Sequence, residues 1–356
     1  MRASRIAIIA MILVIIAASF TSYTLGYRAA SPAPRGVVTI AASLYAPYLS
    51  SALKNSGVGG TVVGMGSVAA ARQIILEPGA YGVFLSVDPA VIEDMLYPRG
   101  IASWYVAIAS DQMVIGVSRS SPAYGELAAL NSSLNAAMSE GNVSAEKEIL
   151  GRILAVVLSG NYTVGTSDPN TDPEGYRALM MLQLSGIWLR VDPNYYVQEL
   201  SALNSSGKLY EVPMGSALFS YIETGRVDFD IALYESSAIQ QGIPHILLPP
   251  QVNLGDANYS QFYARSSVEI ESGGEPIELH GAPIYICFTI PNAYPDKTQA
   301  ALVALYMISP EGRSLLRSYG AVPLATPLLY GNASQVPYPL SALINTSVLS
   351  YAGPID

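Results

Sequence analysis

The stretch "GVVTIAASLYAPYLSSALKNSG", residues 36–57, sets the fold class of this chain. A β-branched run is followed by Ala-Ser and then by a segment with helical character that ends at Gly57. The stretch "TVVGMGSVAAARQII", residues 61–75, repeats the order of strand, Gly-Ser and helix. Strands that alternate with helices are typical of an α/β fold built on a mostly parallel sheet. We therefore predict an α/β protein, and 356 residues favour two domains over one.

Composition excludes several classes of function. The chain is 51% hydrophobic and 13% charged with a net charge of −9, so it lacks the basic surface that a nucleic-acid partner requires. Its one cysteine, Cys287, lies in the apolar run "PIYICFTIP" and is predicted to be a buried, inert thiol. The two histidines, His245 and His280, are expected in loops. This inventory argues against a zinc enzyme or a Ser-His hydrolase, and no cofactor is expected.

The N-terminus predicts export. Arg2 and Arg5 precede an unbroken apolar run from Ile6 to Ala18, which fits a signal-peptide core or, extended to Tyr27, a short membrane anchor. Positive residues before the run place the rest of the chain outside the cell. We expect residues 1–35 to form a signal or anchor and a tether, so that the protein is extracytoplasmic and held at the membrane, or secreted if the run is cleaved.

Seven glycosylation sequons support the same location. Each has the form Asn-X-Ser/Thr, and they start at Asn131, Asn142, Asn161, Asn204, Asn258, Asn332 and Asn345. This density favours a glycoprotein.

The stretch "SDPNTDPEGYRALM", residues 167–180, places a carboxylate at the start of a helix. Asp172 is predicted to cap that helix, Pro173 to occupy its first position and Gly186 to end it. Helix starts offer free N–H groups and a partial positive charge, so they usually receive anions.

Serines mark two further helix starts. Ser43 and Ser67 each follow a predicted strand, where ligands of open α/β sheets bind. Either serine could be a simple cap, but several such helix starts in a chain with few charges favour an anion receptor.

Two segments resemble known proteins. "TQAALVALYMISPEGRSLLRSYGAVPL", residues 298–324, resembles the closing helix of two-lobed solute-binding proteins of ABC importers. "DPEGYR", residues 172–177, resembles a motif of the archaeal tungstate/molybdate-binding proteins. The resemblance implies a type II periplasmic-binding-protein-like fold with two lobes, each a mostly parallel sheet flanked by helices. Lobe 1 would comprise residues 37–117 and 247–356, and lobe 2 residues 118–246.

The resemblance also implies a binding site for the oxyanion. The matching stretches are "AASL", "GSVA", "DPEGYR" and "LYESSA", which give Ala42, Ser43, Ser67, Asp172, Pro173, Glu174 and Tyr234. In that family an aspartate at the position of Asp172 is a ligand to the Mo or W atom, and a backbone N–H near Glu174 could donate to the ligand. A carboxylate repels sulfate and phosphate, whose central atoms accept no further ligands.

One position departs from the family. The family has a second coordinating glutamate at or near Gly215, where this chain has none. Glu211, four residues before Gly215, and Glu174, in place of the family's cysteine, are the carboxylates that could compensate.

The expected function is therefore the binding component of an ABC importer that captures molybdate or tungstate and passes it to a membrane permease. It would act as a monomer and catalyse no reaction. A receptor for sulfate, phosphate or another tetrahedral anion is the alternative. The alternatives from other functional classes are an exported hydrolase and a purely structural surface glycoprotein.

Overall fold

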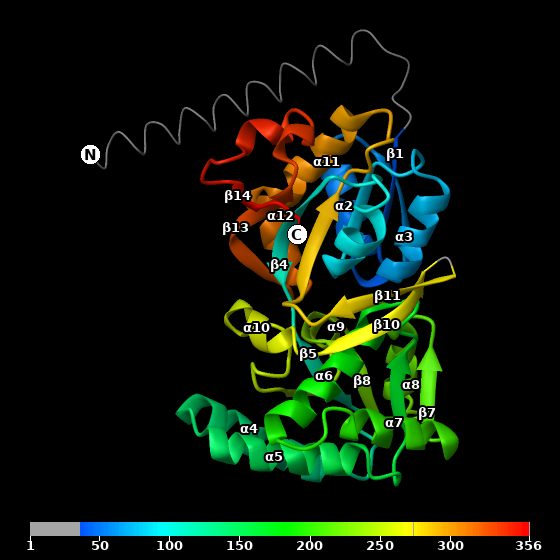
Figure 1. Ribbon diagram of the computed structural model, residues 1–356, viewed down its shortest axis with the longest axis vertical. Helices are drawn as coiled ribbons and strands as arrows, with labels where there is room; N and C mark the ends of the chain where they lie inside the picture. Colours follow the sequence, from blue (N-terminus) through cyan, green and yellow to red (C-terminus); the bar gives the residue numbers. More distant parts are fainter. Residues whose placement is uncertain (1–35, 273, 356) are drawn as a thin grey trace, which may run out of the picture. The chain divides into compact units, whose positions relative to one another are not determined.

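The computed structural model describes residues 36–272 and 274–355, so the predicted N-terminal signal or anchor lies outside the described residues. The described chain forms a seven-stranded sheet, a five-stranded sheet and a separate β-hairpin, with helices packed on the sheets (Figure 1). In these two ranges, no helix has both the length and the apolar character needed to span a membrane.

The seven-stranded sheet is built from both ends of the chain. Its order is β14-β13-β4-β12-β3-β1-β2. The strands are β1 (Val37–Ala42), β2 (Gly60–Met65), β3 (Val83–Ser86), β4 (Trp104–Ser110), β12 (Tyr285–Thr289), β13 (Val322–Gly331) and β14 (Ser350–Gly353). Its accompanying helices are η1 (Ser43–Tyr45), α2 (Ala46–Asn55), α3 (Ser67–Leu76), η2 (Val91–Leu96), α11 (Lys297–Ile308), α12 (Pro310–Ser318), η5 (Ala333–Gln335) and η6 (Leu340–Leu343).

The five-stranded sheet uses the middle of the chain, in the order β7-β6-β8-β5-β9. The strands are β5 (Met113–Val117), β6 (Val164–Ser167), β7 (Leu209–Val212), β8 (Phe229–Tyr234) and β9 (His245–Leu247). Its helices are α4 (Tyr124–Glu140), α5 (Val143–Val157), α6 (Pro173–Leu189), α7 (Tyr195–Ser205), η3 (Gly215–Leu218), α8 (Phe219–Glu223) and α9 (Glu235–Gln241).

Both sheets are mixed, which corrects the expectation of mostly parallel sheets. In the first sheet β12 runs antiparallel to both β3 and β4, while β1 pairs in parallel with β2 and β3. In the second, β5 runs antiparallel to β8 and β9. Both β12 and β13 run opposite to β4, and β5 runs opposite to its two neighbours, so each sheet contains strands of both directions.

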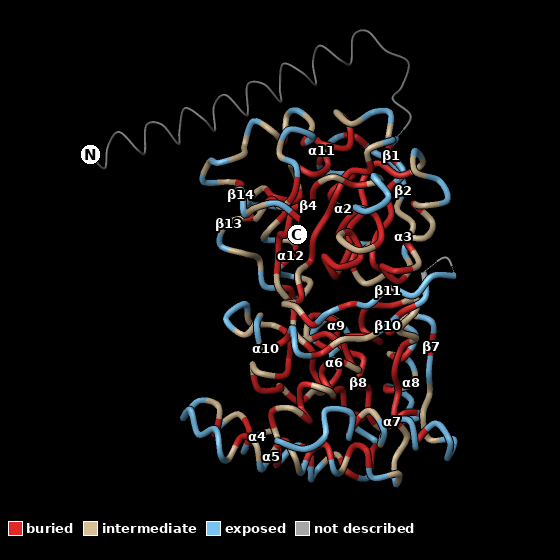
Figure 2. The backbone as a smooth tube through the Cα atoms, viewed as in Figure 1, coloured by how far each residue is buried: buried red, intermediate tan, exposed pale blue. Residues whose placement is uncertain are grey.

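Two segments that the sequence analysis assigned to lobe 1 pair within the five-stranded sheet. Residues 113–117 were assigned to lobe 1, but they form β5, which lies between β8 and β9 in the five-stranded sheet. Leu247 was assigned to lobe 1 as well, but it ends β9 of that same sheet. Most buried hydrophobic residues of both sheets form one large cluster, and a smaller second cluster includes Val114 of β5 and Leu233 of β8. Figure 2 shows buried backbone running through both sheets.

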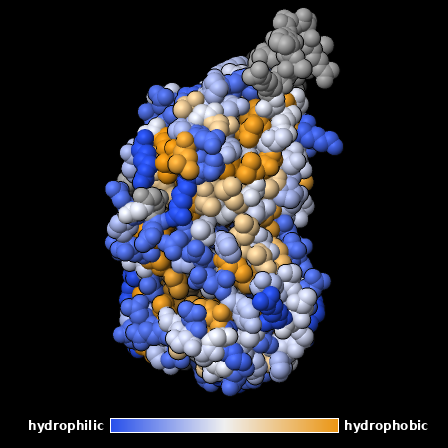
Figure 3. All heavy atoms as spheres, turned by 90° about the vertical axis from the view of Figure 1, so that its right-hand side faces the viewer, coloured by the Kyte–Doolittle hydropathy of each residue, from blue (hydrophilic) through white to orange (hydrophobic). Residues whose placement is uncertain are grey.

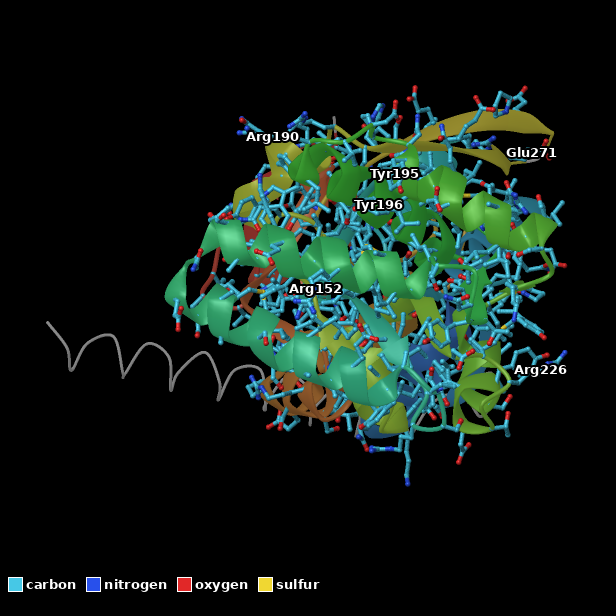
Figure 4. The ribbon with its side chains drawn as sticks, turned by 90° about the horizontal axis from the view of Figure 1, so that it is seen from below. Arg152, Arg190, Tyr195, Tyr196, Arg226 and Glu271 are labelled. Atoms are coloured by element: carbon cyan, nitrogen blue, oxygen red, sulfur yellow. The ribbon has the colours of Figure 1, made fainter. Side chains whose placement is uncertain are left out.

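Residues 256–280 carry structure that the sequence analysis left unassigned. The helices η4 (Ala257–Tyr259) and α10 (Ser260–Tyr263) precede a hairpin of β10 (Ser267–Ser272) and β11 (Glu275–His280). The backbone N–H of Glu271 donates to Asn170 Oδ1 (2.9 Å), and Arg72 of α3 donates to the Glu271 carbonyl. Figure 4 shows Glu271 on this hairpin. The hairpin therefore contacts helices or loops of both sheets.

Three local predictions can be compared directly with the fold. Cys287 is fully buried, as predicted, and burial raises the pKa of its thiol well above the usual value. The histidines were expected in loops, but His245 begins β9 and His280 ends β11. Gly186 was expected to end a helix, but α6 continues to Leu189. Gly186 is instead required for close packing, because a Cβ there would lie 2.6 Å from the carbonyl oxygen of Asp192.

Candidate functional site

A small cavity lies where strand ends and helix starts of the two sheets meet. One wall follows β1, β2 and β3, and the other comes from α6, the η3–α8 segment, the end of β8 and α9. The lining residues are Ala42, Ser43, Leu44, Gly66, Val87, Asp172, Glu174, Ser216, Phe219, Tyr234 and Ser237. Among the described residues, none of the side chains that line it is Lys, Arg or His.

The structure brings together five of the predicted site residues, namely Ala42, Ser43, Asp172, Glu174 and Tyr234. The other four do not line the cavity. Ser67 is buried behind Gly66, and its Oγ accepts from the Val87 N–H (3.3 Å). Pro173 occupies the first position of α6, as predicted.

Gly215 and Glu211 differ in their relation to the site. The Gly215 N–H donates to Asp172, so this residue supports the wall without lining it. Glu211 is exposed on β7, where it pairs with Thr166, and it does not line the cavity.

Sequence reasoning missed two serines that line the cavity. Ser216 and Ser237 both lie in the first turn of a helical segment, one after β7 and the other after β8. Ser43 was identified as a serine at a helix start after a strand, and the same criterion would have found Ser216 and Ser237. Leu44, Val87 and Phe219 carry no comparable signal in the sequence.

Asp172 connects two of the segments that form the cavity wall. It caps α6 as predicted, and its Oδ1 accepts from the Glu174 N–H (3.4 Å). Its Oδ2 accepts from the Gly215 N–H (2.6 Å) at the start of η3. Both oxygens therefore accept a backbone hydrogen bond. A backbone N–H near Glu174 was predicted as a possible donor to the ligand, and the N–H of Glu174 itself donates to Asp172.

The Glu174 side chain spans the cavity wall toward β8. Its Oε1 accepts from the Tyr234 N–H (3.4 Å) and from Ser237 Oγ (3.3 Å). Its Oε2 lies against Gly215, because a Cβ on that residue would overlap it. The carboxyl group of Glu174 thus occupies the space that a side chain at position 215 would need.

The site is acidic and shielded from solvent. Asp172 and Glu174 are 5% and 7% exposed, so desolvation raises the pKa of both carboxyl groups. The nearby charge of Asp172 raises the pKa of Glu174 further. Within the described ranges, no group of three His, Cys, Asp or Glu side chains is placed to hold a metal ion. The cavity therefore combines two carboxyl groups with three serine side chains, those of Ser43, Ser216 and Ser237.

Comparison with known proteins identifies the family. Residues 29–322 match the family described as "Bacterial extracellular solute-binding protein". The chain belongs to this family. An uncharacterized solute-binding protein of Petrotoga mobilis is 30% identical over 290 residues, which cover 80% of this chain and 82% of the relative.

A second relative is named for the anion that it binds. The molybdate/tungstate-binding protein of Thermococcus kodakarensis is 24% identical over 308 residues, or 81% of this chain and 78% of the relative. The periplasmic molybdate-binding protein of Azotobacter vinelandii has a similar fold, with a TM-score of 0.51 and 18% identity, covering 80% of this chain and 98% of that one. The fold is thus that of type II periplasmic binding proteins, and the chain is the extracytoplasmic solute-binding component of an ABC transporter.

In this solute-binding protein, contacts beside the cavity join the two sheets. Ser43 Oγ lies 3.3 Å from Ser216 Oγ. The Ala69 N–H of α3 donates to the Thr171 carbonyl (3.3 Å), and a Cβ on Gly66 would overlap that carbonyl. Tyr45 donates to Ser236 Oγ (2.8 Å). The cavity wall is therefore continuous across the boundary between the sheets.

Buried Asp230 predicts how stability depends on pH. Its Oδ1 accepts from the Ala232 N–H (3.0 Å), its Oδ2 has no partner within the described chain, and burial raises its pKa to about 8. An unfolded aspartate titrates near about 3.9. Because the folded pKa is higher, the folded protein holds an extra proton between these values, and this stabilising contribution is lost as the pH rises through about 8. The Tm should therefore fall by several degrees between pH 5 and pH 8.

Calorimetric Tm values in buffers without oxyanions would check this dependence. Asp230→Asn should flatten the fall, whereas Asp192→Asn in the exposed loop after α6 should leave it unchanged. A Tm that rises from pH 5 to pH 8 in the unmodified protein would contradict the assignment.

Proposed function

We propose that this protein captures molybdate or tungstate and delivers the anion to an ABC permease. The observation that carries the proposal is the pair of buried carboxyl groups, Asp172 and Glu174, in a cavity whose other lining residues are uncharged. A sulfate or phosphate ion would meet two carboxyl groups and no lysine, arginine or histidine on the described walls. The central atom of molybdate or tungstate can accept further oxygen ligands, so a carboxylate is compatible with that anion.

The sequence relation to a molybdate/tungstate-binding protein supports the same ligand. In this proposal the two sheets belong to two lobes that close over the anion. The protein acts as a monomer, catalyses no reaction, and is held at the membrane by its N-terminal segment. Sugar on exposed sequons, such as Asn161 and Asn204, would fit the extracytoplasmic location.

Isothermal titration of the purified protein with tungstate, molybdate, sulfate and phosphate tests the proposal. Tungstate and molybdate should bind at least about a hundredfold more tightly than sulfate, which corresponds to about 2.7 kcal/mol. Tighter binding of sulfate or phosphate would favour the alternative receptor. Absence of binding by all four anions would refute an oxyanion receptor.

Ser43 provides a second test of the cavity. Its hydroxyl lines the cavity opposite Ser216, so we expect it to donate to a bound anion. A hydrogen bond to a charged group contributes about 1.5–3 kcal/mol, so Ser43→Ala should weaken tungstate binding about tenfold or more. Ser51→Ala is the matched control, because among the described residues the Ser51 hydroxyl hydrogen-bonds only to the Pro47 carbonyl of α2. Equal affinity of Ser43→Ala and the unmodified protein would remove Ser43 from the site.

A further inference from the structure

We propose that Glu174 is the carboxylate that contacts the central atom of the bound oxyanion, and that Asp172 positions the backbone around it. This inference rests on the proposed function. It differs from the sequence-based expectation, which gave the contact with Mo or W to Asp172.

The hydrogen bonds of Asp172 show why it is the positioning residue. Each of its oxygens accepts a backbone N–H, from Glu174 at the start of α6 and from Gly215 at the start of η3. These bonds hold two segments of the cavity wall together. Asp172 therefore has no oxygen free of a hydrogen bond, in contrast to Glu174.

The hydrogen bonds of Glu174 leave one oxygen free. Oε1 accepts from Tyr234 and Ser237, which fixes the side chain along the wall. Within the described chain, no hydrogen bond reaches Oε2. Glu174 lines the cavity and only its Oε1 accepts hydrogen bonds from described residues, so Oε2 is the carboxylate atom available to a ligand.

Gly215 is the residue that permits this arrangement. A Cβ at position 215 would overlap Glu174 Oε2, so any other residue there would displace the carboxyl group. The backbone of Gly215 still donates to Asp172. Gly215 and Glu174 therefore act as a matched pair, in which the missing side chain makes room for the carboxyl group.

The consequence is selectivity for oxyanions whose central atom can add an oxygen ligand. A carboxylate oxygen fixed in the cavity repels sulfate and phosphate, whose central atoms remain four-coordinate. The same oxygen can join the first coordination sphere of Mo or W. Glu174 is thus the residue expected to discriminate between the two kinds of anion.

The decisive experiment compares Glu174→Gln with the unmodified protein by calorimetric titration and by X-ray absorption spectroscopy of bound tungstate. Glutamine keeps an oxygen that can accept from Tyr234 and Ser237, but it replaces Oε2 with an amide nitrogen. We expect tungstate affinity to fall about a hundredfold, sulfate affinity to stay equal or rise, and the tungsten to lose one oxygen neighbour.

Gly215→Ala tests the same geometry without altering a carboxyl group. It should weaken tungstate binding about as much as Glu174→Gln, because its Cβ displaces Oε2. In a protein that already carries Glu174→Ala, Gly215→Ala should lower the tungstate affinity by less than about threefold, because the oxygen atom that its Cβ would displace is gone. Circular dichroism and the Tm of each variant establish that it is folded.

The outcomes separate this inference from the proposed function. If the unmodified protein binds tungstate and Glu174→Gln keeps both its affinity and its tungsten coordination, the inference is overturned and the receptor stands. Independent, additive losses from Gly215→Ala and Glu174→Ala would also overturn it. If the unmodified protein binds no oxyanion, the proposed function fails, and the inference fails with it.

Discussion

Replacing Arg177 with methionine is expected to lower the free energy of unfolding by about 3–5 kcal/mol, because it leaves a buried carboxylate without its partner. Arg177 Nε and Nη2 lie 2.7 and 2.6 Å from Asp88 Oδ2, and both side chains are completely buried. Tyr176 also donates to Asp88 (2.5 Å), and Arg177 Nη1 donates to the Ala282 carbonyl (2.6 Å). Asp88 follows β3, and Arg177 lies in α6, so this cluster joins the two sheets.

Urea unfolding, followed by circular dichroism, measures this loss. Arg152→Met is the matched control, since Arg152 is exposed on α5 (Figure 4), and it should change the unfolding free energy by less than about 0.5 kcal/mol. The double variant Asp88→Asn/Arg177→Met should lower the free energy of unfolding less than Arg177→Met alone does, because no unpaired charge remains buried. A loss below about 1 kcal/mol for Arg177→Met would show that Asp88 finds another partner.

The second large effect is expected from Asp172→Asn. Asparagine caps most helices as well as aspartate does, but here both carboxylate oxygens accept a backbone N–H. An asparagine offers one oxygen and one NH₂ group, so one N–H would face another donor. An unsatisfied buried group costs about 1–3 kcal/mol, and the wall formed by Glu174 and Gly215 should shift with it. All four oxyanions should therefore lose affinity by about tenfold or more, to a similar extent.

Asp296→Asn separates this effect from simple capping. Asp296 caps α11 through a single bond from the Gln299 N–H (3.1 Å), so asparagine should replace it at a cost below about 0.5 kcal/mol. Titration calorimetry and thermal unfolding of both variants give the comparison. A loss confined to tungstate and molybdate would instead assign the metal contact to Asp172.

Local chemistry was enough to predict part of the site. Asp172 and Pro173 occupy the cap and first turn of a helix because those positions depend only on neighbouring residues. Ser43 lines the cavity because it follows β1, where helix starts converge, whereas Tyr234 was predicted from the family resemblance. The rule failed for Ser67, since its side chain turns toward the Val87 N–H behind the wall.

Features that depend on contacts distant in sequence could not be predicted. Nothing near Glu174 shows that its carboxyl group lies over Gly215, about forty residues later, and the relation appears only when η3 packs against α6. The place of β5 in the second sheet depends on its pairing with β8 and β9. Gly186 was misjudged for the same reason, because its close neighbour is the backbone after the helix.

The apolar residues on the surface of the protein form separate patches. On the face shown in Figure 3, hydrophobic side chains gather in several patches that are separated by hydrophilic ones. This distribution keeps each patch small, which is usual for proteins that do not associate through that face.

The strand order has a consequence for how the chain folds. The five-stranded sheet has all its strands once β9 has been synthesised, because it uses only residues 113–247. In contrast, β4 pairs with β12 on one side and β13 on the other, and both are made much later. During synthesis from the N-terminus, this apolar strand has two unpaired edges, which are prone to aggregation until residue 331 is available. The seven-stranded sheet is therefore the first to begin and the last to be completed. Export of the chain before folding would prevent β4 from pairing with incorrect strands during synthesis.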